Sequence, residues 1–316
     1  MNKKPSLFAP MTLLHTPVLF LIFNRPDTTA CVFDMIRQAK PPRLYIASDG
    51  PRESRAGESL RVRETRDFVL QSISWDCEVK TLFRENNLGC KIAVSSAITW
   101  FFEQEEMGII LEDDTVPSLN FFWFCEELLE KYKDDLRVLH VDGTSFSQVL
   151  PISESYDFSK YALIWGWATW RRAWKSYDVK MGTFREFLSG KMIERVWDTR
   201  AEQEFWTRLL SLAYEDKVDT WDFQWFYTIW SMNGLTIRPR INMVKNIGFS
   251  QEATHTKKSS RMFDDMLAMH YEEPLTHPKF VLQNKTMDRN CSFVRFGITS
   301  NFLWRVYRKI LGLLKV

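Results

Sequence analysis

Short apolar runs alternate with longer amphipathic stretches through the first half of the chain. Such runs are typical of strands buried on both faces of a parallel sheet, and the stretches between them are typical of helices. The pattern predicts strands at 18–23, 44–48, 79–83, 108–111 and 138–141, and helices at 26–38, 58–72, 90–103 and 121–131. Pro26 suits the first turn of the first helix, and Ser118 is the expected cap of the last one. This alternation predicts an α/β fold with a mostly parallel, doubly wound sheet.

The second half of the chain has a different pattern. After Pro151 the sequence becomes aromatic-rich, with helices and irregular loops, and strand-like composition returns at 234–247. No flexible linker separates the two halves, so we expect one continuous catalytic domain at 17–256, whose second half forms an acceptor side. We also expect a leader at 1–16 before this domain and an extension at 257–316 after it.

A polar segment at 256–266 leads into the extension, which contains a candidate helix at 301–316. One face of this helix carries Phe302, Leu303, Val306, Ile310, Leu313 and Leu314, and the other carries Arg305, Arg308 and Lys315. A wide apolar face opposite basic residues favours a helix that lies on an anionic membrane surface. The alternative is a helix docked on the protein's own core.

Composition narrows the class of protein. The 316 residues are 45% hydrophobic and 26% charged, as in ordinary soluble proteins, and the net charge of +2 gives no indication of nucleic-acid binding. The five cysteines are scattered and form no C-x-x-C pair, so we expect neither a zinc site nor a disulfide framework. No apolar run is long enough for a transmembrane helix. We therefore expect a cytoplasmic protein, either free or peripheral on the cytoplasmic face of the membrane.

Tryptophan is unusually abundant in one segment. Nine of the 13 tryptophans lie between Trp165 and Trp230. A large core uses tryptophan sparingly because the indole N–H needs a partner. Two interpretations stay open: an irregular aromatic core, and a stacking surface for sugar rings.

Three consecutive acids, Glu112, Asp113 and Asp114, follow the apolar run at 108–111. They are expected at the carboxyl end of a buried strand, which is where open α/β sheets bind ligands. Adjacent carboxylates repel one another unless a positive group joins them. We favour a divalent cation carrying a diphosphate over the alternative, in which the acids pair with nearby lysines and arginines.

Polar residues also follow the earlier strands. Asn24 and Arg25 come after the first strand and Asp49 after the second, so a parallel sheet would place them at the same edge as the acids. These groups suit a nucleotide, although Asp-Gly after a strand is also ordinary turn chemistry. The Gly-x-Gly-x-x-Gly and P-loop fingerprints are both absent.

Two further segments are candidates. Asp222 lies between tryptophans, where partial desolvation would make it a better general base, although a helix cap explains it equally well. The loop at 248–255 is rich in small and hydroxyl residues and ends in His255. It could close over a diphosphate, but a plain surface loop is the simpler interpretation.

The order of these pieces resembles nucleotide-sugar glycosyltransferases of the GT-A fold. The resemblance is closest to a bacterial glycosyltransferase-like group that shares Gly-Trp-Ala-Thr-Trp-Arg-Arg-Ala-Trp, here at 166–174, and Asp-Thr-Trp-Asp-x-Gln-Trp, here at 219–225. More distantly, the chain is similar to the GlcNAc-transferase I family. That family shows Glu-Asp-Asp after a strand, a Trp-Asp pair, then Arg-Pro-x-Ile, here at 238–241, and a phosphate loop. The resemblance covers about residues 17–256.

The resemblance implies a role for each candidate. Asp114 would bind Mn²⁺ (or Mg²⁺) that bridges the donor diphosphate, and Asp222 would be the catalytic base. The other donor contacts would come from Asn24, Arg25, Asp49, Glu112, Asp113, Trp221, Thr254 and His255. Independently of the resemblance, the tryptophan-rich segment offers Trp165 and Trp167 as candidates for stacking on the acceptor or sugar. The chain departs from the eukaryotic pattern after Asp222, where an acid is replaced by Phe223.

The implied activity is a metal-dependent, inverting transfer of a hexose-type sugar in polysaccharide biosynthesis. The donor would be a nucleoside-diphosphate sugar, with UDP favoured, and the acceptor a hydroxyl of a glycan or of a lipid-linked glycan. One alternative is a sugar nucleotidyltransferase, which would want a glycine-rich loop after the first strand, whereas 24–27 contains no glycine. The others are a non-catalytic carbohydrate-binding protein and a glycoside hydrolase with two opposed carboxylates.

Overall fold

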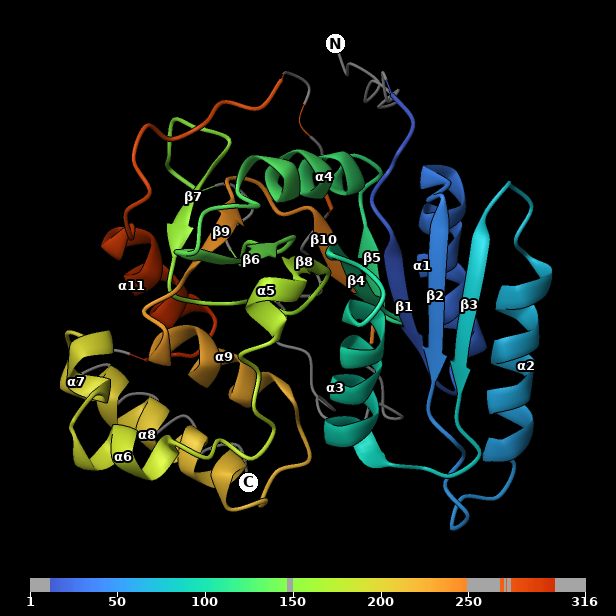
Figure 1. The fold of residues 1–316 in the computed structure, drawn as a ribbon, viewed down its shortest axis with the longest axis horizontal. Helices are drawn as coiled ribbons and strands as arrows, with labels where there is room; N and C mark the ends of the chain where they lie inside the picture. The colour runs from blue at the N-terminus through green and yellow to red at the C-terminus, as the bar shows by residue number, and fades with distance from the viewer. Residues whose placement is uncertain (1–11, 147–149, 249–267, 270, 272–273, 299–316) are drawn as a thin grey trace, which may run out of the picture.

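The structure is a computed structural model that describes residues 12–146, 150–248, 268–269, 271 and 274–298. The strands are β1 (Val18–Ile22), β2 (Arg43–Ser48), β3 (Glu78–Phe83), β4 (Met107–Glu112), β5 (Thr115–Pro117), β6 (Val138–Asp142), β7 (Tyr156–Ser159), β8 (Trp167–Trp170), β9 (Leu235–Pro239) and β10 (Val244–Asn246). The helices are α1 (Pro26–Ala39), α2 (Glu58–Gln71), α3 (Gly89–Phe102), α4 (Phe121–Lys131), α5 (Arg171–Trp174), α6 (Phe184–Ser189), α7 (Ile193–Val196), α8 (Arg200–Tyr214), α9 (Asp222–Ser231) and α11 (Lys285–Val294). Every element predicted in the first half is present, with its ends shifted by at most one residue (Figure 1).

The main sheet has eight strands in the order β3-β2-β1-β4-β8-β6-β9-β7. Pairing is parallel from β3 through β4 and between β6 and β9, whereas β8 is antiparallel to both of its neighbours and β7 is antiparallel to β9. The predicted mostly parallel α/β sheet is therefore confirmed, with two strands of reversed direction. A separate small sheet pairs β5 with β10.

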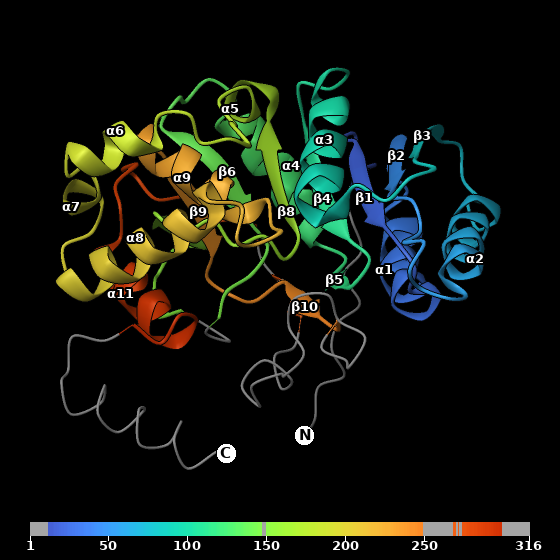
Figure 2. The same ribbon diagram turned by 90° about the horizontal axis from the view of Figure 1, so that it is seen from below.

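Helices cover both faces of the main sheet. In Figure 2, α1 and α2 lie on one face and α3 lies on the other. Side chains of α1 and α4 pack with β1 and β4 in one hydrophobic cluster, and side chains of α3, α8 and α9 form a second cluster. The strands of the first half are apolar in continuous runs because both of their faces are covered in this way.

The tryptophan-rich segment supplies much of the second cluster. Eight of its nine tryptophans are buried, and only Trp165 is partly exposed. Trp197, Trp206 and Trp230 pack against one another, with ring centroids 4.8 to 6.3 Å apart. The burial of these three rings agrees with the first of the two interpretations, in which the tryptophans form an aromatic core.

The expected cap of α4 is wrong. The residue at the cap position is Asn120, and it makes no side-chain cap bond. Ser118 Oγ donates to Asn120 Oδ1 (3.0 Å), while the Ser118 carbonyl accepts a bond from Phe121 N (3.1 Å). A tight backbone turn therefore satisfies a donor that the serine hydroxyl was expected to serve.

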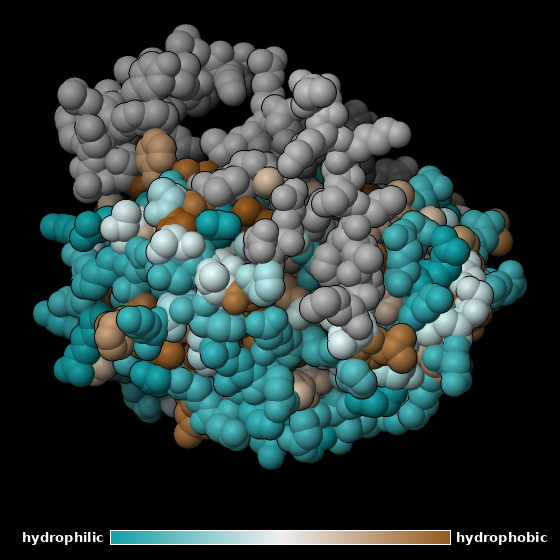
Figure 3. Space-filling model, turned by 90° about the horizontal axis from the view of Figure 1, so that it is seen from above, coloured by the Kyte–Doolittle hydropathy of each residue, from teal (hydrophilic) through white to brown (hydrophobic). Residues whose placement is uncertain are grey.

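Within the described ranges, no helix is both long and apolar enough to cross a membrane. Figure 3 shows one face of the molecule, where hydrophobic residues lie in small groups among hydrophilic ones. The candidate helix at 301–316 and the polar segment at 256–266 lie outside the described residues. The division at residues 16 and 256 stays a prediction, although His15 and Thr16 already donate their backbone N–H groups to Glu126 on α4.

Candidate active site

The acid triplet lies where the sequence predicted it, at the carboxyl end of β4. Glu112 is the last residue of β4 and pairs in register with Leu21 of β1. The loop after β1 therefore lies beside the triplet: Phe23 N donates to Asp113 Oδ2 (3.1 Å). The Arg25 guanidinium forms ion pairs with Asp113 and with Asp114 (3.0 Å to Oδ2). We call this part of the molecule, where β1, β2, β4 and β6 end, the carboxyl edge.

The acids at the carboxyl edge are only partly compensated by Arg25. Burial raises the pKa of Glu112, and the negative charges of Asp114, Asp113 and Asp222 raise it further. Burial also raises the pKa of Asp113, against the opposing effect of Arg25. A single positive charge, that of Arg25, thus lies among several negatively charged carboxylates. This excess of negative charge favours the binding of a further cation.

Asp114 lies under the strand that leads into the candidate phosphate loop. Ile247 N donates to the Asp114 backbone carbonyl (2.8 Å), which continues the pairing of β10 with β5. A Cβ added to Gly248 would lie 2.0 Å from Asp114 Oδ2, so only glycine lets the chain pass this close to the carboxylate. The loop at 248–255 therefore starts directly against Asp114. Thr254 and His255 lie outside the described residues.

Asp49 and Asn24 also lie at the carboxyl edge, but protein groups already occupy them. The Asp49 carboxylate accepts bonds from the backbone N–H groups of Gly50, Leu88 and Gly89, at 2.9 to 3.1 Å, and from Asn87 Nδ2 (2.9 Å). Asn24 Nδ2 donates to Glu58 Oε1 (2.8 Å). A nucleotide would have to exchange these bonds for its own, so their predicted role in donor binding stays a prediction.

Asp222 is the first residue of α9 and lies close enough to the triplet to raise the pKa of Glu112. Its Oδ1 accepts bonds from Thr220 Oγ1 and from Phe223 N (3.0 Å). Burial is the main cause that raises the pKa of Asp222. The preceding residue, Trp221, occupies the cap position without a side-chain cap bond, so Asp222 is an acid of the first turn and not the cap itself.

A second acid, Asp219, was quoted in the sequence motif but not assigned a role. Its carboxylate accepts bonds from Cys90 N (3.0 Å) and Lys91 N (2.9 Å) at the start of α3, and Lys91 Nζ lies 2.5 Å from Asp216. The Asp219 carboxylate thus satisfies two backbone N–H groups at the N-terminus of α3 that have no partner within the helix. This contact fixes the turn that leads to Asp222. The sequence offered one indication of this contact. Leu88, at the cap position of α3, cannot accept a hydrogen bond through its side chain, so the helix needs a cap from another part of the chain.

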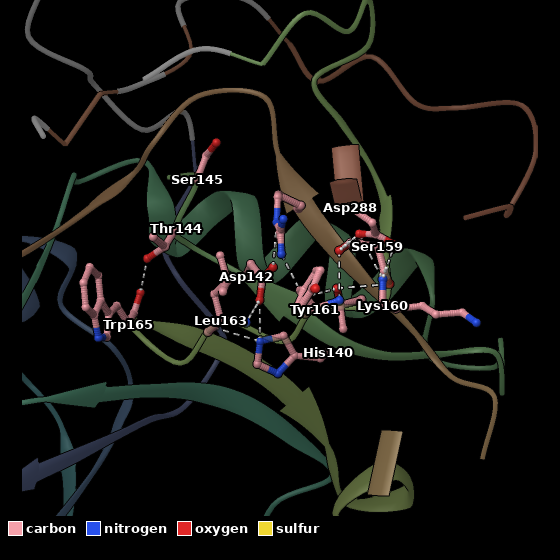
Figure 4. A network of polar contacts seen from close by, with 12 residues as sticks. His140, Asp142, Thr144, Ser145, Ser159, Lys160, Tyr161, Leu163, Trp165 and Asp288 are labelled. Atoms are coloured by element: carbon pink, nitrogen blue, oxygen red, sulfur yellow. Dashed lines mark hydrogen bonds and ion pairs between the residues drawn. The ribbon is translucent and has the colours of Figure 1, made fainter. Parts of the chain in front are cut away.

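The two candidate stacking tryptophans lie in different environments. Trp167 is fully buried, and its ring lies nearly parallel to the rings of His140 (4.8 Å) and Trp221 (5.5 Å). Trp221 is buried too, so neither ring presents a face to a ligand in this structure. Trp165 is partly exposed, and its carbonyl accepts a bond from Thr144 Oγ1 (2.7 Å; Figure 4). We therefore retain only Trp165 in the sugar-stacking hypothesis.

A buried polar network fixes the strand ends next to Trp165. Trp225 Nε1 donates to His140 Nδ1 (3.1 Å), so the ring proton of neutral His140 is on Nε2. That nitrogen lies 2.7 Å from Asp142 Oδ1, which also accepts a bond from Leu163 N (2.7 Å; Figure 4). Arg238 Nε lies 3.4 Å from the other oxygen of Asp142. The network is enclosed in the core and serves to support the edge.

Comparisons with known proteins give distant structural likenesses. No protein-family model matches the sequence, and no curated protein matches it. The chain is similar to mannosyltransferase PcManGT from Pyrobaculum calidifontis, whose structure holds GDP-Man and Mn²⁺. The identity is 16% over 54% of this chain and 49% of that chain, with a TM-score of 0.36. This match spans about half the length of the mannosyltransferase.

Two other structures illustrate the range. Mouse xyloside xylosyltransferase 1 matches at 13% identity over 69% of this chain and 82% of that chain, with a TM-score of 0.35. HddC from Yersinia pseudotuberculosis matches at 10% identity over 50% of this chain and 77% of that chain, with a TM-score of 0.31. At these TM-scores the likenesses carry no inference about chemistry, and the site has to be argued from its own residues.

Proposed function

We propose that this protein is a glycosyltransferase of the GT-A fold that moves a sugar from a nucleoside-diphosphate sugar to an acceptor hydroxyl. One observation carries the proposal. Three acids, Glu112, Asp113 and Asp114, lie with Arg25 at the carboxyl edge of a mostly parallel sheet, and the charge of a fourth, Asp222, raises the pKa of Glu112. Open α/β sheets bind ligands at such an edge, and an excess of carboxylates there suits a ligand that arrives with a cation.

A divalent metal fits the donor set when the donor's phosphates complete it. Within the described residues, no group of three or more His, Cys, Asp or Glu side chains is arranged to hold a metal ion. Mg²⁺, however, is commonly held by one or two carboxylates together with substrate phosphates. Asp114 would hold Mn²⁺ or Mg²⁺ in this way, beside Gly248 and the start of the candidate phosphate loop. The bound ion would neutralise charge on the departing nucleoside diphosphate.

The protein's own groups divide the remaining work between binding and proton transfer. Arg25 fixes the positions of Asp113 and Asp114, and Glu112 and Asp113 face the donor's sugar and ribose. Asp222 takes the proton of the acceptor hydroxyl as that oxygen attacks the anomeric carbon from the face opposite the diphosphate. One displacement of this kind inverts the anomeric configuration. We also propose that this protein is a member of the bacterial glycosyltransferase-like group that is distantly similar to the GlcNAc-transferase I family.

Ligand-induced stabilisation tests the donor assignment. A ligand that binds the folded state alone raises the melting temperature, so UDP-sugars and GDP-sugars are screened with and without Mn²⁺. We expect one nucleotide-sugar to stabilise the protein only when Mn²⁺ is present, with UDP-sugars as the first group to test. Asp114→Ala should remove the metal-dependent part of the shift. Equal stabilisation of parent and variant would contradict the metal assignment.

The rival activity needs its own assay. A sugar nucleotidyltransferase would release pyrophosphate from a nucleoside triphosphate and a sugar 1-phosphate. We expect no pyrophosphate from UTP or GTP with such substrates, because the loop after β1, at 24–27, contains no glycine. If pyrophosphate is released and the release depends on Asp114, the protein is a sugar nucleotidyltransferase and the glycosyltransferase proposal is wrong. The acceptors to test are glycans and lipid-linked glycans.

A further inference from the structure

The main sheet continues beyond β7 into the residues that precede α11. Gln283 forms a parallel bridge with Phe158 of β7, and Asn284 N donates to the Phe158 carbonyl (2.7 Å). The helix α11 is bound to the same strand, because the buried Asp288 carboxylate accepts a bond from Ser159 Oγ (Figure 4). Figure 1 shows α11 beside β7, at the end of the sheet opposite β3. Buried polar contacts of this kind are costly to separate, so this part of the chain holds a fixed position.

The extended residues before α11 present two large apolar side chains to solvent. Phe280 is 71% exposed and Leu282 is 68% exposed, whereas Val281 between them packs against the hydrophobic cluster of α1 and α4. Successive side chains of an extended chain point to opposite sides, so Phe280 and Leu282 both point away from that cluster. Single exposed apolar side chains are ordinary, whereas neighbouring ones that point the same way form a patch that a partner can cover.

The charged side chains exposed around this apolar pair are all basic. Lys279 comes directly before it, and Lys285 and Arg289 lie one turn apart on α11, on one exposed face of the helix. Between Lys279 and Arg289 the only acid is Asp288, which is buried. From outside this stretch, Asp198 forms an exposed ion pair with Lys285 (2.9 Å). We call the five exposed side chains the α11 surface: Lys279, Phe280, Leu282, Lys285 and Arg289.

The composition of the α11 surface decides which kind of partner it suits. A stable contact with a protein buries about 800 Å² on each partner, which is far more than two apolar side chains supply. A lipid bilayer with anionic head groups needs less. Apolar side chains insert between the head groups, and lysine and arginine gain from the negative surface potential even when they stay at the level of the phosphates.

We propose that the α11 surface docks this protein on an anionic lipid bilayer. Phe280 and Leu282 enter the interfacial layer, and the three basic side chains lie at the level of the phosphates. The helix that the sequence predicts at 301–316 carries the same mixture of apolar and basic residues, so the following part of the chain suits the same partner. Docking as such does not depend on the proposed function.

The position of α11 gives docking a consequence for the acceptor. The helix has ten residues and is therefore about 15 Å long. Directly after it, the guanidinium carbon of Arg295 lies 5.4 Å from the ring centroid of Trp165. In the register of β8 with β4, Trp167 lies opposite Ile110, and two residues further on Trp165 comes level with Glu112. Docking through the α11 surface thus holds the carboxyl edge near the bilayer. On the basis of the proposed function, this favours a lipid-linked glycan as acceptor over a free one.

The first test is flotation of the full chain with vesicles, which needs no substrate. We expect binding to vesicles that contain phosphatidylglycerol, little binding to pure phosphatidylcholine, and weaker binding at high salt. Phe280→Ser combined with Leu282→Ser should weaken binding at least about tenfold. Arg289→Gln should weaken it about fivefold, the effect of one basic residue at an anionic surface. A parent that does not bind, or a double variant that binds like the parent, overturns the proposal.

Matched variants on α2 control for exposure and charge. Leu60 is 57% exposed and Arg63 is exposed too, and α2 lies at the other end of the sheet (Figure 1). Leu60→Ser and Arg63→Gln should bind vesicles like the parent, and an equal loss in these variants would overturn the proposal. All the changed side chains are exposed, so melting temperatures should stay near the parental value. If the double variant does not fold, each serine variant is tested alone and should show part of the loss.

Sedimentation without lipid tests the competing partner. If the parent forms a dimer that the double variant does not form, and the parent does not bind vesicles, the α11 surface is a contact between two copies of the chain and the proposal is wrong. We expect instead that parent and double variant sediment alike.

The second test uses turnover once a donor has been found. The double variant should raise the KM for a lipid-linked acceptor embedded in phosphatidylglycerol vesicles and leave the KM for a soluble glycan unchanged. An equal KM of parent and variant for the embedded acceptor would overturn the link between docking and acceptor. Vesicle binding without any sugar transfer would refute the proposed function and leave the docking surface standing. Sugar transfer without vesicle binding would refute the docking surface alone.

Discussion

The two sides of the candidate site are built in different ways. The proposed donor side, which comprises Arg25 and the acids at 112–114, is assembled from the ends of adjacent strands β1 and β4. The proposed acceptor side, which comprises Trp165 and Asp222, is assembled from two distant segments, held by the packing of Arg295 on Trp165 and by the capping of α3 by Asp219. The donor side is thus a direct product of sheet topology, whereas the acceptor side depends on how the second half packs. The two sides should therefore fail in different ways when their residues are changed.

The largest effect is expected from Asp222→Asn. The amide keeps the size of the side chain but cannot accept the acceptor's proton, so transfer should fall about 10²- to 10⁴-fold. Donor binding, measured by calorimetry with Mn²⁺, should stay close to the parental value because the donor side is intact. Transfer at near the parental rate would rule out Asp222 as the base. Asp219→Asn is the matched variant: it weakens the cap of α3 and should reduce transfer by a smaller factor.

The sequence predicted the donor side better than the acceptor side, for a physical reason. A continuous apolar run reports burial on both faces, and parallel strands end at one edge, so the meeting of Arg25 with Asp113 follows from local pattern alone. The insertion of β8 between β4 and β6 has no local signal, because strand order depends on long-range packing. The capping of α3 by Asp219, 128 residues from Lys91, is hidden for the same reason.

The individual roles were harder to predict than the positions. Asp49 lies at the predicted edge, yet its carboxylate is taken up by backbone N–H groups of the turn before α3. Trp165 and Trp167 are two positions apart and were treated alike, but only Trp167 lies within a strand that is buried on both faces. Arg295 lies in a segment that the sequence assigned to an extension. Contacts of this kind are decided by tertiary packing, which a residue pattern does not contain.

A pair of alanine variants sharpens the contrast between those two tryptophans. Trp167→Ala should lower the free energy of unfolding by about 3–5 kcal/mol, because it leaves a large cavity in the core. Trp165→Ala should cost well under half of that, since its ring is partly exposed. Urea unfolding measures both. If Trp165→Ala also spares stability but raises the KM for an acceptor, the sugar-stacking hypothesis gains support; an unchanged KM would remove it.

On the donor side, Arg25→Gln breaks a partly buried ion pair. Asp113 is 3% exposed and would lose its positive partner, so the variant should lose about 2–4 kcal/mol of stability. The matched change Arg37→Gln breaks the exposed pair with Asp34 and should cost about 0–1 kcal/mol. Adding Asp113→Asn to Arg25→Gln should restore part of the loss. Equal losses for Arg25→Gln and Arg37→Gln would show that the donor side is not held together by this charge.

The smallest effect, and the most specific one, concerns Glu112 and pH. Burial raises its pKa in the folded state, so between the ordinary glutamate pKa and the raised value the folded state binds more protons than the unfolded state. Stability contributed by protonated Glu112 is therefore lost as pH rises through the folded-state pKa. Glu112→Gln removes this dependence and should be more stable than the parent at pH 8, by on the order of 1 kcal/mol, with the difference vanishing towards pH 5.

Urea unfolding of the apo protein at the two pH values measures this difference. Glu103→Gln, which changes an exposed carboxylate after α3, is the control and should leave the pH profile unaltered. With Mn²⁺ and a bound nucleotide-sugar, the parent should be more stable than Glu112→Gln at pH 8. The Glu112 carboxylate then lies near positive charge, which favours its ionised form. If the difference in stability between Glu112→Gln and the parent is the same at both pH values, ionised Glu112 does not destabilise the folded protein. The donor side would then need no cation to offset its negative charge.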